Sequence, residues 1–356
     1  MANPVLTQAI DELASGRDLS AEQAAEVLAE IMHGEVSEIQ IAGFLIGLRT
    51  KGETVAELTG LARTMRALAA HVPTERHDLL DTAGTGGGRS TFNVSTTAAL
   101  IAAGAGCAVA KHGNRSATSS SGSADLLEAL GARIDLDPEG VARCIDETGF
   151  GFMFAPAHHR ATRFVVPVRR ELAVRTIFNL IGPLTNPAGA RRQLIGVSDA
   201  RFLETIAGAL VGLGVDRALV VAGEDSLDEI SIAATTKVVE VNGQDVSRYT
   251  LAPSDVGVEL SSDDTFRRDC SGGTPQQNAA LTRAILDGGS ASAERPAAVD
   301  LAVINAGAAI YVGGRADTIA AGVQAARAAL ADGSAASALE RYVQASRTHG
   351  PAEVAR

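Results

Sequence analysis

Up to about Ala70 the chain carries a pattern of capping residues and apolar positions that predicts short helices. Three Ser or Thr residues are followed three positions later by Gln or Glu, which is the spacing of a capping box at a helix start. These pairs are Ser20 with Gln23, Ser37 with Gln40, and Thr54 with Glu57. Gly16, Gly34 and Gly52 stand where such helices should end. Residues 39–48 are apolar almost all round, so we expect this helix to be buried on more than one side.

From Leu79 the pattern changes to short apolar runs that alternate with helical segments. The runs that predict strands are residues 79–82, 107–111, 152–155, 193–197 and 218–222. The segments that predict the intervening helices are residues 94–103, 124–130, 138–148 and 201–213. Alternation of this kind predicts an α/β fold, with an N-terminal helical domain and a larger α/β domain built on a mainly parallel central sheet.

A different pattern occupies residues 235–261, which are β-branched and polar. The pair Asn242-Gly243 lies inside this stretch and is typical of a tight turn between antiparallel strands. Helical patterns return at residues 277–286, 297–311 and 316–331. We find no internal repeat, and only the residues after Gly350 are expected to form a flexible end.

Composition and charge narrow the classes of function. The 356 residues are 46% hydrophobic and 21% charged, which is an ordinary mixture for a globular protein with a sizeable core. The formal net charge of −11 should repel nucleic acid, whereas a phosphorylated small molecule meets only a few local groups. No apolar run is long enough to predict a membrane span, and the first residues lack the pattern of a signal peptide.

The three cysteines, Cys107, Cys144 and Cys270, are widely spaced and form no metal-binding motif. An odd number also argues against a disulfide framework, so a reducing compartment is the simplest interpretation. Together with the absence of a predicted leader, this predicts a cytoplasmic protein.

A glycine-rich loop follows the first predicted strand. It reads Asp81-Thr82-Ala83-Gly84-Thr85-Gly86-Gly87-Gly88-Arg89-Ser90-Thr91 and opens a helix at Asn93-Val94-Ser95-Thr96. Glycines let backbone N–H groups approach a ligand, and a helix N-terminus favours negative charge, so the segment suits phosphate or pyrophosphate. The alternative is a plain tight turn, and the loop fits neither the Walker nor the dinucleotide fingerprint.

A second candidate follows the next predicted strand. Lys111-His112-Gly113-Asn114-Arg115-Ser116 is followed by a serine-rich stretch at residues 119–123. Ligands bind at the carboxyl edge of open α/β sheets, and Lys and Arg donate to phosphate oxygens. The alternative is a polar surface loop.

Two further candidates are acidic and basic. Asp228-Glu229 follows an apolar strand, and adjacent carboxylates hold hard cations through oxygen, although a solvated acidic turn is the commoner outcome for such a pair. Arg169 precedes the rigid segment Gly182-Pro183-Leu184-Thr185-Asn186-Pro187 and could fork onto a carboxylate, or could pair with Glu171. His158 and His159 are interpreted as structural or surface residues, since no third metal ligand is in view.

In combination these segments resemble the anthranilate phosphoribosyltransferase family. The resemblance rests on motifs that occur in the family's order and span most of the chain. They are Gly84-Thr85-Gly86-Gly87, Asn93-Val94-Ser95-Thr96, Lys111-His112-Gly113-Asn114-Arg115-Ser116, Ser121-Gly122-Ser123-Ala124-Asp125, Phe178-Asn179-Leu180-Ile181-Gly182-Pro183-Leu184-Thr185-Asn186-Pro187 and Asp228-Glu229.

The resemblance implies a helical domain at residues 1–72 that forms a homodimer interface. It implies an α/β domain at residues 73–350, with a segment near residues 165–190 packed on the helical domain. It also implies transfer of a phosphoribosyl group from phosphoribosyl pyrophosphate to anthranilate, in the second step of tryptophan biosynthesis, with Mg²⁺ as cofactor.

Site residues follow from the same resemblance. Those expected to hold the phosphoribosyl donor are Gly84, Gly87, Gly88, Thr91, Asn93, Ser95, Thr96, Lys111, Asn114, Ser119 and Ser123. Those expected to contact anthranilate are Gly84, Asn114 and Arg169, with Gly182 and Pro183 shaping its channel. Those expected to bind Mg²⁺ are Ser95, Asp228 and Glu229. No catalytic acid or base is assigned, because positioning and electrostatics would carry the chemistry.

One departure from the family pattern concerns the glycine loop. Members of the family usually read Gly-Thr-Gly-Gly-Asp-Gly, whereas here Gly88 follows Gly87 directly and the loop is one residue shorter. Donor binding is then expected to rely more on backbone N–H groups, and the roles of Gly88 and Arg89 stay open.

Two alternatives compete with this interpretation. A pyrimidine nucleoside phosphorylase shares the general architecture, but Asp228-Glu229 and the Gly-Pro-Leu-Thr-Asn-Pro segment favour the transferase. A non-catalytic nucleic-acid-binding relative is disfavoured by the net charge of −11.

Overall fold

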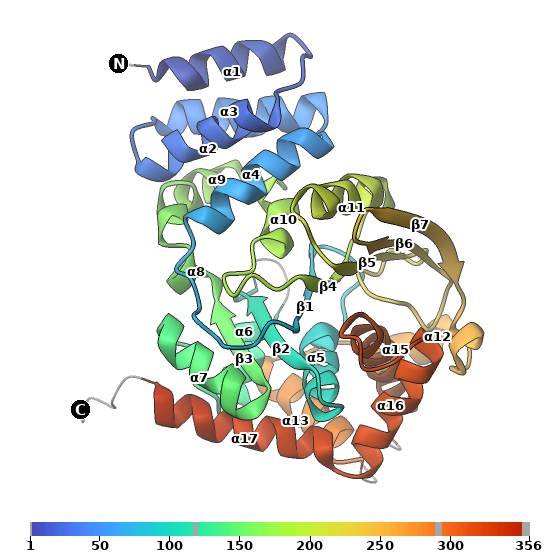
Figure 1. Ribbon diagram of the computed structural model, residues 1–356. Coiled ribbons are helices and arrows are strands. Elements are labelled where there is room, and N and C mark those ends of the chain that lie inside the picture. Colours follow the sequence, from blue (N-terminus) through green and yellow to red (C-terminus); the bar gives the residue numbers. More distant parts are fainter. Residues whose placement is uncertain (1, 117–119, 289–293, 351–356) are drawn as a thin grey trace.

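The computed structural model describes residues 2–116, 120–288 and 294–350. A layer of helices lies at one end of a seven-stranded sheet, and further helices cover the opposite side of that sheet (Figure 1). The N-terminal helices are α1 (Pro4–Ala14), α2 (Ala21–His33), α3 (Glu38–Lys51) and α4 (Val55–Ala67). None of the helices in the described ranges has both the length and the apolarity needed to cross a membrane.

Capping explains where the N-terminal helices begin. The predicted boxes at Ser20 and Thr54 are both formed reciprocally. The predicted box at Ser37 is only half formed, because Ser37 caps the Gln40 amide while the Gln40 side chain pairs with the backbone of Asn3. Asn3 in turn caps α1, so one amide side chain ties the starts of two helices together.

The sheet has the order β3-β2-β1-β4-β5-β6-β7, with parallel pairing from β3 to β5 and antiparallel pairing from β5 to β7. Its strands are β1 (Leu79–Gly84), β2 (Ala108–Gly113), β3 (Phe150–Phe154), β4 (Arg192–Gly196), β5 (Arg217–Gly223), β6 (Thr236–Asn242) and β7 (Asp245–Leu251). The predicted fold class is confirmed, and the Asn242-Gly243 pair does form the turn between β6 and β7.

Some predicted strand ends were wrong by one or two residues. β3 begins at Phe150, directly after Gly149 ends the preceding helix at φ +77°. It stops at Phe154 because a short helix with Pro156 in its first turn begins there. β2 extends to Gly113, so Lys111 and His112 belong to the strand itself.

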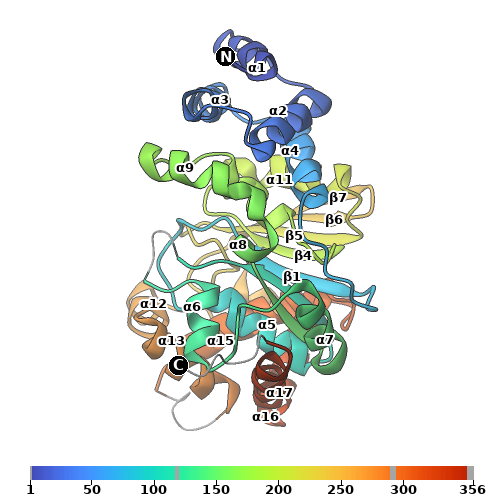
Figure 2. The same ribbon diagram turned by 90° about the vertical axis from the view of Figure 1, so that its left-hand side faces the viewer.

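Side chains of the sheet alternate between two cores. Leu194, Leu219 and Val221 point into a core shared with the C-terminal helices. Ile195 and Val220 point into a second core shared with the N-terminal helices. Figure 2 shows the sheet between these two layers, with α1 and α17 (Ser334–His349) at opposite ends of the molecule.

The helices of the first core run along one side of the sheet. They are α5 (Val94–Gly104), α6 (Ser123–Ala129), α7 (Pro138–Thr148), α12 (Asp263–Cys270), α13 (Pro275–Leu286), α15 (Pro296–Val312), α16 (Ile319–Ala331) and α17 (Ser334–His349). Neither α12 nor α17 was predicted from the sequence. α17 packs its buried Tyr342 ring 4.7 Å from the ring of Phe150, measured between centroids.

The second core extends through the middle of the chain. The helices of this region are α8 (Ala155–His158), α9 (Val166–Leu172), α10 (Phe178–Ile181) and α11 (Leu203–Gly212). Val168, Ile177 and Leu184 pack among the buried residues of α1 to α4, and Arg66 of α4 donates to the Leu184 carbonyl at 2.6 Å. The N-terminal helices and residues 165–184 therefore form one continuous layer.

Candidate active site

Three polar segments meet at the carboxyl edge of the sheet. The glycine loop at residues 84–92 begins at the last residue of β1. A Lys- and Ser-rich segment begins within β2 and continues beyond it, and an acidic turn at residues 224–229 follows β5. Gly86 N donates to Asp228 Oδ2 at 3.0 Å, which joins the first segment to the third. Lys111 Nζ lies 3.4 Å from Ser95 Oγ, which joins the second to the helix that follows the glycine loop. This is the edge at which ligands bind in open α/β sheets.

The glycine loop lies so close to the acidic turn that side chains would not fit. A Cβ at Gly88 would come within 2.7 Å of the Ser226 carbonyl oxygen and 2.8 Å of Asp228 Oδ1. Gly86 and Gly87 both have positive φ, at +66° and +79°, a conformation that glycine adopts without strain. Glycine at these positions therefore allows the backbone to approach a carboxylate closely.

Lys111 is buried under this edge. Its Nζ donates to the carbonyl of Thr82 at 2.5 Å and lies 3.2 Å from the Thr82 hydroxyl. Burial lowers the pKa of Lys111, while the neighbouring carboxylates of Asp81 and Glu229 raise it. The Lys111 ammonium group therefore lies between the buried carboxylate of Asp81 and Glu229 of the acidic turn.

Asp228 and Glu229 are partly exposed, yet the surrounding protein shifts the pKa of both carboxyl groups. Burial and the charge of Asp228 raise the pKa of Glu229 to about 8, against the opposing effects of Lys111 and the Ser95 backbone N–H. Burial also raises the pKa of Asp228. Two adjacent carboxyl groups in such an environment are costly to ionise unless a cation joins them.

The oxygen groups at this position fit a hard cation. Carboxylates of Asp228 and Glu229 and the Ser95 hydroxyl are the ligand types that Mg²⁺ uses together with substrate phosphates and water. In the described ranges no group of three His, Cys, Asp or Glu side chains converges. A soft-metal or all-carboxylate site is therefore not built into the described part of the chain.

Asn93 is fixed at the mouth of the site by three hydrogen bonds. Its Nδ2 donates to the Ser121 carbonyl at 3.0 Å, and its Oδ1 accepts from Ser121 Oγ at 3.1 Å and from Asn278 Nδ2 at 2.8 Å. Ser123 Oγ donates to the Asn114 carbonyl at 3.2 Å. The predicted residues Asn93, Asn114 and Ser123 therefore lie in adjoining segments: Asn93 precedes α5, Asn114 follows β2, and Ser123 begins α6.

Other predicted donor-binding residues lie deeper or elsewhere. Thr96 is buried in α5, and its hydroxyl has no partner among the described residues. Thr91 stands at the far end of the glycine loop, where a Cβ on Gly272 would be 2.3 Å from the Thr91 carbonyl. Ser119 lies outside the described residues.

Arg169 lies on α9, in the helical layer, and makes no hydrogen bond to the glycine loop in the described part of the chain. Its guanidinium carbon is 5.3 Å from the centre of the Phe178 ring, and burial lowers its pKa. It forms no salt bridge to Glu171 or to any other described carboxylate, so that alternative is not what the structure shows. Arg169 is therefore a partly buried cation without a counterion among the described residues.

Arg175 was not predicted, although it touches the glycine loop directly. Its Nη1 donates to the Gly86 carbonyl at 2.7 Å, and its Nη2 donates to that of Thr85 at 3.3 Å. Its own carbonyl accepts from Arg49 at 2.6 Å, which ties α3 to the loop. Arg49, Arg175 and Thr85 all line a cavity of about 870 Å³ beside the loop. A lone Arg in the sequence carries no signal for such a backbone contact.

His112, His158 and His159 pack together beneath the site. His158 and His159 are both buried, and the His159 ring is 5.0 Å from that of His112, measured between centroids. Burial lowers the pKa of all three rings, and lowers that of His159 to about 4. They are neutral at physiological pH and form part of the packing beneath the site.

Comparison with known proteins gives concordant matches along most of the chain. A family model described as the helical bundle domain of a glycosyl transferase family matches residues 7–69, and the α/β domain of the same family matches residues 76–336. An anthranilate phosphoribosyltransferase of Rubrobacter xylanophilus is 50% identical over 344 residues, which cover 96% of this chain and 98% of the relative. One of Symbiobacterium thermophilum is 49% identical and covers 93% of this chain and 94% of its own.

Solved structures agree with these matches. The crystal structure of anthranilate phosphoribosyltransferase from Thermus thermophilus superimposes with a TM-score of 0.87 at 45% identity, covering 95% of this chain and 99% of that one. The Saccharomyces cerevisiae enzyme in complex with PRPP and Mg superimposes with a TM-score of 0.88 over 98% and 99% of the two chains. At 24% identity, that likeness shows the fold alone.

Proposed function

The chain belongs to the anthranilate phosphoribosyltransferase family, and we propose that the site at the carboxyl edge of its sheet carries out the family's reaction. That reaction transfers the phosphoribosyl group of phosphoribosyl pyrophosphate to the amine of anthranilate. Its products are N-(5-phosphoribosyl)anthranilate and pyrophosphate, and it is the second step of tryptophan biosynthesis from chorismate.

One observation carries the assignment of the site. The backbone of the glycine loop, the buried Lys111 ammonium and the Asp228-Glu229 pair come from three separate strands and meet at one edge. Backbone N–H groups and an ammonium group bind phosphate oxygens, and a carboxylate pair binds the cation that accompanies pyrophosphate. The combination fits a metal-bound pyrophosphorylated donor.

The residues proposed to bind the donor are those expected from the sequence. They are Gly84, Gly87, Gly88, Thr91, Asn93, Ser95, Thr96, Lys111, Asn114, Ser119 and Ser123. The support for Asn93 as a member of this set is that hydrogen bonds hold both the nitrogen and the oxygen of its side-chain amide. A preorganised amide loses little freedom when a ligand arrives.

Mg²⁺ is the proposed cofactor, held by Ser95, Asp228 and Glu229. When bound, it would neutralise charge on the departing pyrophosphate. The Saccharomyces cerevisiae relative, which was solved with PRPP and Mg, supports this choice of ion. In this chain, Lys111 offsets part of the negative charge of Glu229.

Anthranilate is proposed to bind between Gly84, Asn114 and Arg169, with Gly182 and Pro183 along its channel. The support is Arg169, whose guanidinium is partly buried and unpaired with any described carboxylate. Such a group can receive the carboxylate of anthranilate. The aromatic amine is neutral at physiological pH and needs no strong base before it attacks, so orientation is the main contribution of these residues.

The helical layer is the proposed homodimer interface, within a helical domain placed at residues 1–72. Ile39 on α3 is 83% exposed and Ile46 is 37% exposed, although the same helix buries Phe44 and Leu45 completely. Apolar side chains exposed on a helix that is also buried on its other side are typical of a subunit contact.

A reducing, cytoplasmic location is also part of the proposal. The three cysteines are free and buried, and burial raises the pKa of each thiol to about 12. Buried neutral thiols behave as small apolar side chains.

The test is a fluorescence assay with purified protein, anthranilate, phosphoribosyl pyrophosphate and Mg²⁺. The chain contains no Trp, so protein fluorescence interferes little with that of anthranilate. We expect loss of anthranilate fluorescence that requires both the donor and Mg²⁺. No loss with folded protein, together with phosphate-dependent cleavage of thymidine or uridine, would instead identify a nucleoside phosphorylase.

A further inference from the structure

We propose that Arg89 is a positioning residue that holds the shortened glycine loop against the acidic turn. The inference rests on the proposed function, because it concerns the loop and the turn that would bind the donor and its metal. In this proposal Arg89 keeps the loop backbone at a fixed distance from Asp228 and is assigned no contact with the substrate.

The loop and the turn are in direct contact on both sides of Gly88. Arg89 N donates to the Ser226 carbonyl at 3.0 Å, and Gly86 N donates to Asp228 Oδ2 at 3.0 Å. If the loop moved, the Gly86 N–H group would move away from the Asp228 carboxylate, which is proposed to bind Mg²⁺.

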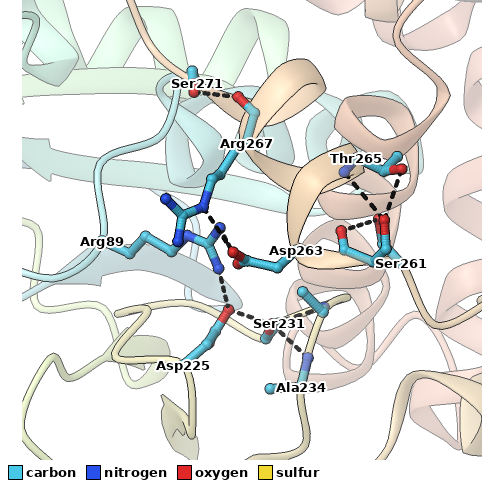
Figure 3. A network of polar contacts seen from close by, with 11 residues as sticks. Arg89, Asp225, Ser231, Ala234, Ser261, Asp263, Thr265, Arg267 and Ser271 are labelled. Atoms are coloured by element: carbon cyan, nitrogen blue, oxygen red, sulfur yellow. Dashed lines mark hydrogen bonds and ion pairs between the residues drawn. The ribbon is translucent and has the colours of Figure 1, made fainter.

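The Arg89 side chain bridges the acidic turn and α12. Its Nη1 lies 3.3 Å from Asp225 Oδ2 and its Nη2 lies 2.5 Å from Asp263 Oδ1. Its guanidinium carbon also lies 4.0 Å from the centre of the Phe266 ring. Figure 3 shows Arg89 directed between these two carboxylates. Nη1 donates a hydrogen bond to Asp225, whereas the contact of Nη2 with Asp263 is an ion pair without hydrogen-bond geometry, so the guanidinium group is held between the two carboxylates mainly by charge.

The partners of Arg89 are themselves held in place. Asp225 Oδ2 also accepts from Ser231 Oγ at 3.0 Å, and Ser231 Oγ accepts from the backbone amides of Ala233 and Ala234 (Figure 3). The side chains of Arg89 and Asp225 are only 18% and 14% exposed, so solvent screens their attraction weakly. Arg89 is thus anchored to a rigid partner.

The far end of the loop is fixed to the same helix. Phe92 N donates to the carbonyl of Cys270, the last residue of α12, at 3.0 Å. The loop is therefore attached to α12 near Phe92 and through Arg89, and to the acidic turn through Arg89 and Gly86. A loop with one residue fewer has less conformational freedom, and one guanidinium group that bridges two carboxylates can define its position.

The experiment compares Arg89→Ala with Arg267→Ala. Arg267 also pairs with Asp263, at 2.7 Å, but is 72% exposed and forms no hydrogen bond or ion pair with the loop among the described residues. Two properties are measured, namely hydrogen exchange of the amides of residues 84–90 in the ligand-free protein, and the kinetics of transfer. We expect Arg89→Ala to speed exchange of the Gly86 and Arg89 amides and to raise KM for the donor about tenfold, with kcat changed less than about twofold.

Two further variants should show intermediate effects on the KM for the donor. Arg89→Lys keeps one charge but cannot bridge both carboxylates, so its KM should lie between those of the wild type and Arg89→Ala. Asp263→Asn removes one of the two partners and should also be intermediate. Arg267→Ala should match the wild type in both measurements.

Wild-type exchange in the loop of Arg89→Ala, or equal effects of Arg89→Ala and Arg267→Ala, would overturn the proposal. If Arg89→Ala does not fold, the graded variants give the same decision. The exchange measurement needs neither substrate nor metal, so it tests the positioning role even if the protein proves inactive towards anthranilate.

Discussion

At the scale of single residues, the site contains charged side chains whose burial raises the free energy of ionisation. Lys111, Asp228 and Glu229 each have a pKa displaced in the direction that disfavours the charged form. Such groups reduce the stability of the ligand-free protein, because their hydrogen bonds to Thr82 and Gly86 and the attraction between Lys111 and Glu229 offset only part of the cost of burying charge. These three groups therefore lie where the proposed substrate and metal would neutralise their charges.

Replacing Glu229 should separate stability from activity. Glu229→Gln removes one proposed metal ligand and one buried charge, so kcat/KM should fall about a hundredfold or more. The free energy of unfolding, measured in urea without Mg²⁺ at a pH above the raised pKa of Glu229, should stay equal or rise by about 1 kcal/mol. Near-normal turnover at limiting Mg²⁺ would contradict the assignment of Glu229 as a metal ligand.

The neutral His159 predicts a defined acid sensitivity. Its pKa is about 4 in the folded protein against 6.5 when unfolded, so the unfolded chain binds more protons between these values. The free energy of unfolding should therefore fall as pH drops from about 6.5 towards 4, by about 3 kcal/mol from this residue at most. His159→Gln, which can still pair with the Thr185 carbonyl, should reduce that pH dependence in urea titrations; an unchanged slope would contradict the account.

At the scale of elements, short-range signals predicted much of the fold. Apolar runs located all five parallel strands, and the Asn242-Gly243 pair located the antiparallel hairpin. α12 was missed because its sequence is mostly polar and charged, and α17 because most of its buried positions are small or polar rather than large and apolar. Contacts such as Arg175 with the glycine loop join residues far apart in the chain, so no local pattern could predict them.

Arg175 allows a test of how the helical layer supports the loop. Arg175→Ala removes two hydrogen bonds to loop carbonyls, and because Arg175 is exposed, water replaces part of what the charged donor contributes. We expect KM for the donor to rise about tenfold or more in steady-state assays, with partial recovery in Arg175→Lys. Arg170→Ala, on the exposed side of α9, should behave as the wild type. Equal values for Arg175→Ala and Arg170→Ala would show that the loop needs no support from this side.

At the scale of the whole molecule, the sheet separates two cores, and the site lies where its carboxyl edge meets the helical layer. The loops that carry chemistry are anchored on both sides: Arg175 comes from the helical layer, and Arg89 reaches towards α12. The motif residues could be recognised from the sequence, but their mutual distances depend on this arrangement. The departure at Gly88 in particular could be understood only once its contact with Asp228 was visible.

The helical layer should also control the oligomeric state. Ile39→Asp places a charge on the exposed apolar side of α3 and should shift the protein from dimer to monomer in light scattering. Leu260→Asp is the matched control, since Leu260 is 67% exposed and lies three residues before α12, a helix that Figure 1 shows apart from α1 to α4. A monomeric wild type, or a dimer unaffected by Ile39→Asp, would contradict the proposed interface.

The central claim is that three separate segments form one site for a metal-bound pyrophosphorylated donor. Amide hydrogen exchange with and without phosphoribosyl pyrophosphate and Mg²⁺ tests it most directly. The account predicts that residues 84–90, 111–116 and 224–229 become protected together, and that the donor protects them less in Glu229→Gln. Protection confined to one segment, or centred elsewhere in the molecule, would contradict it.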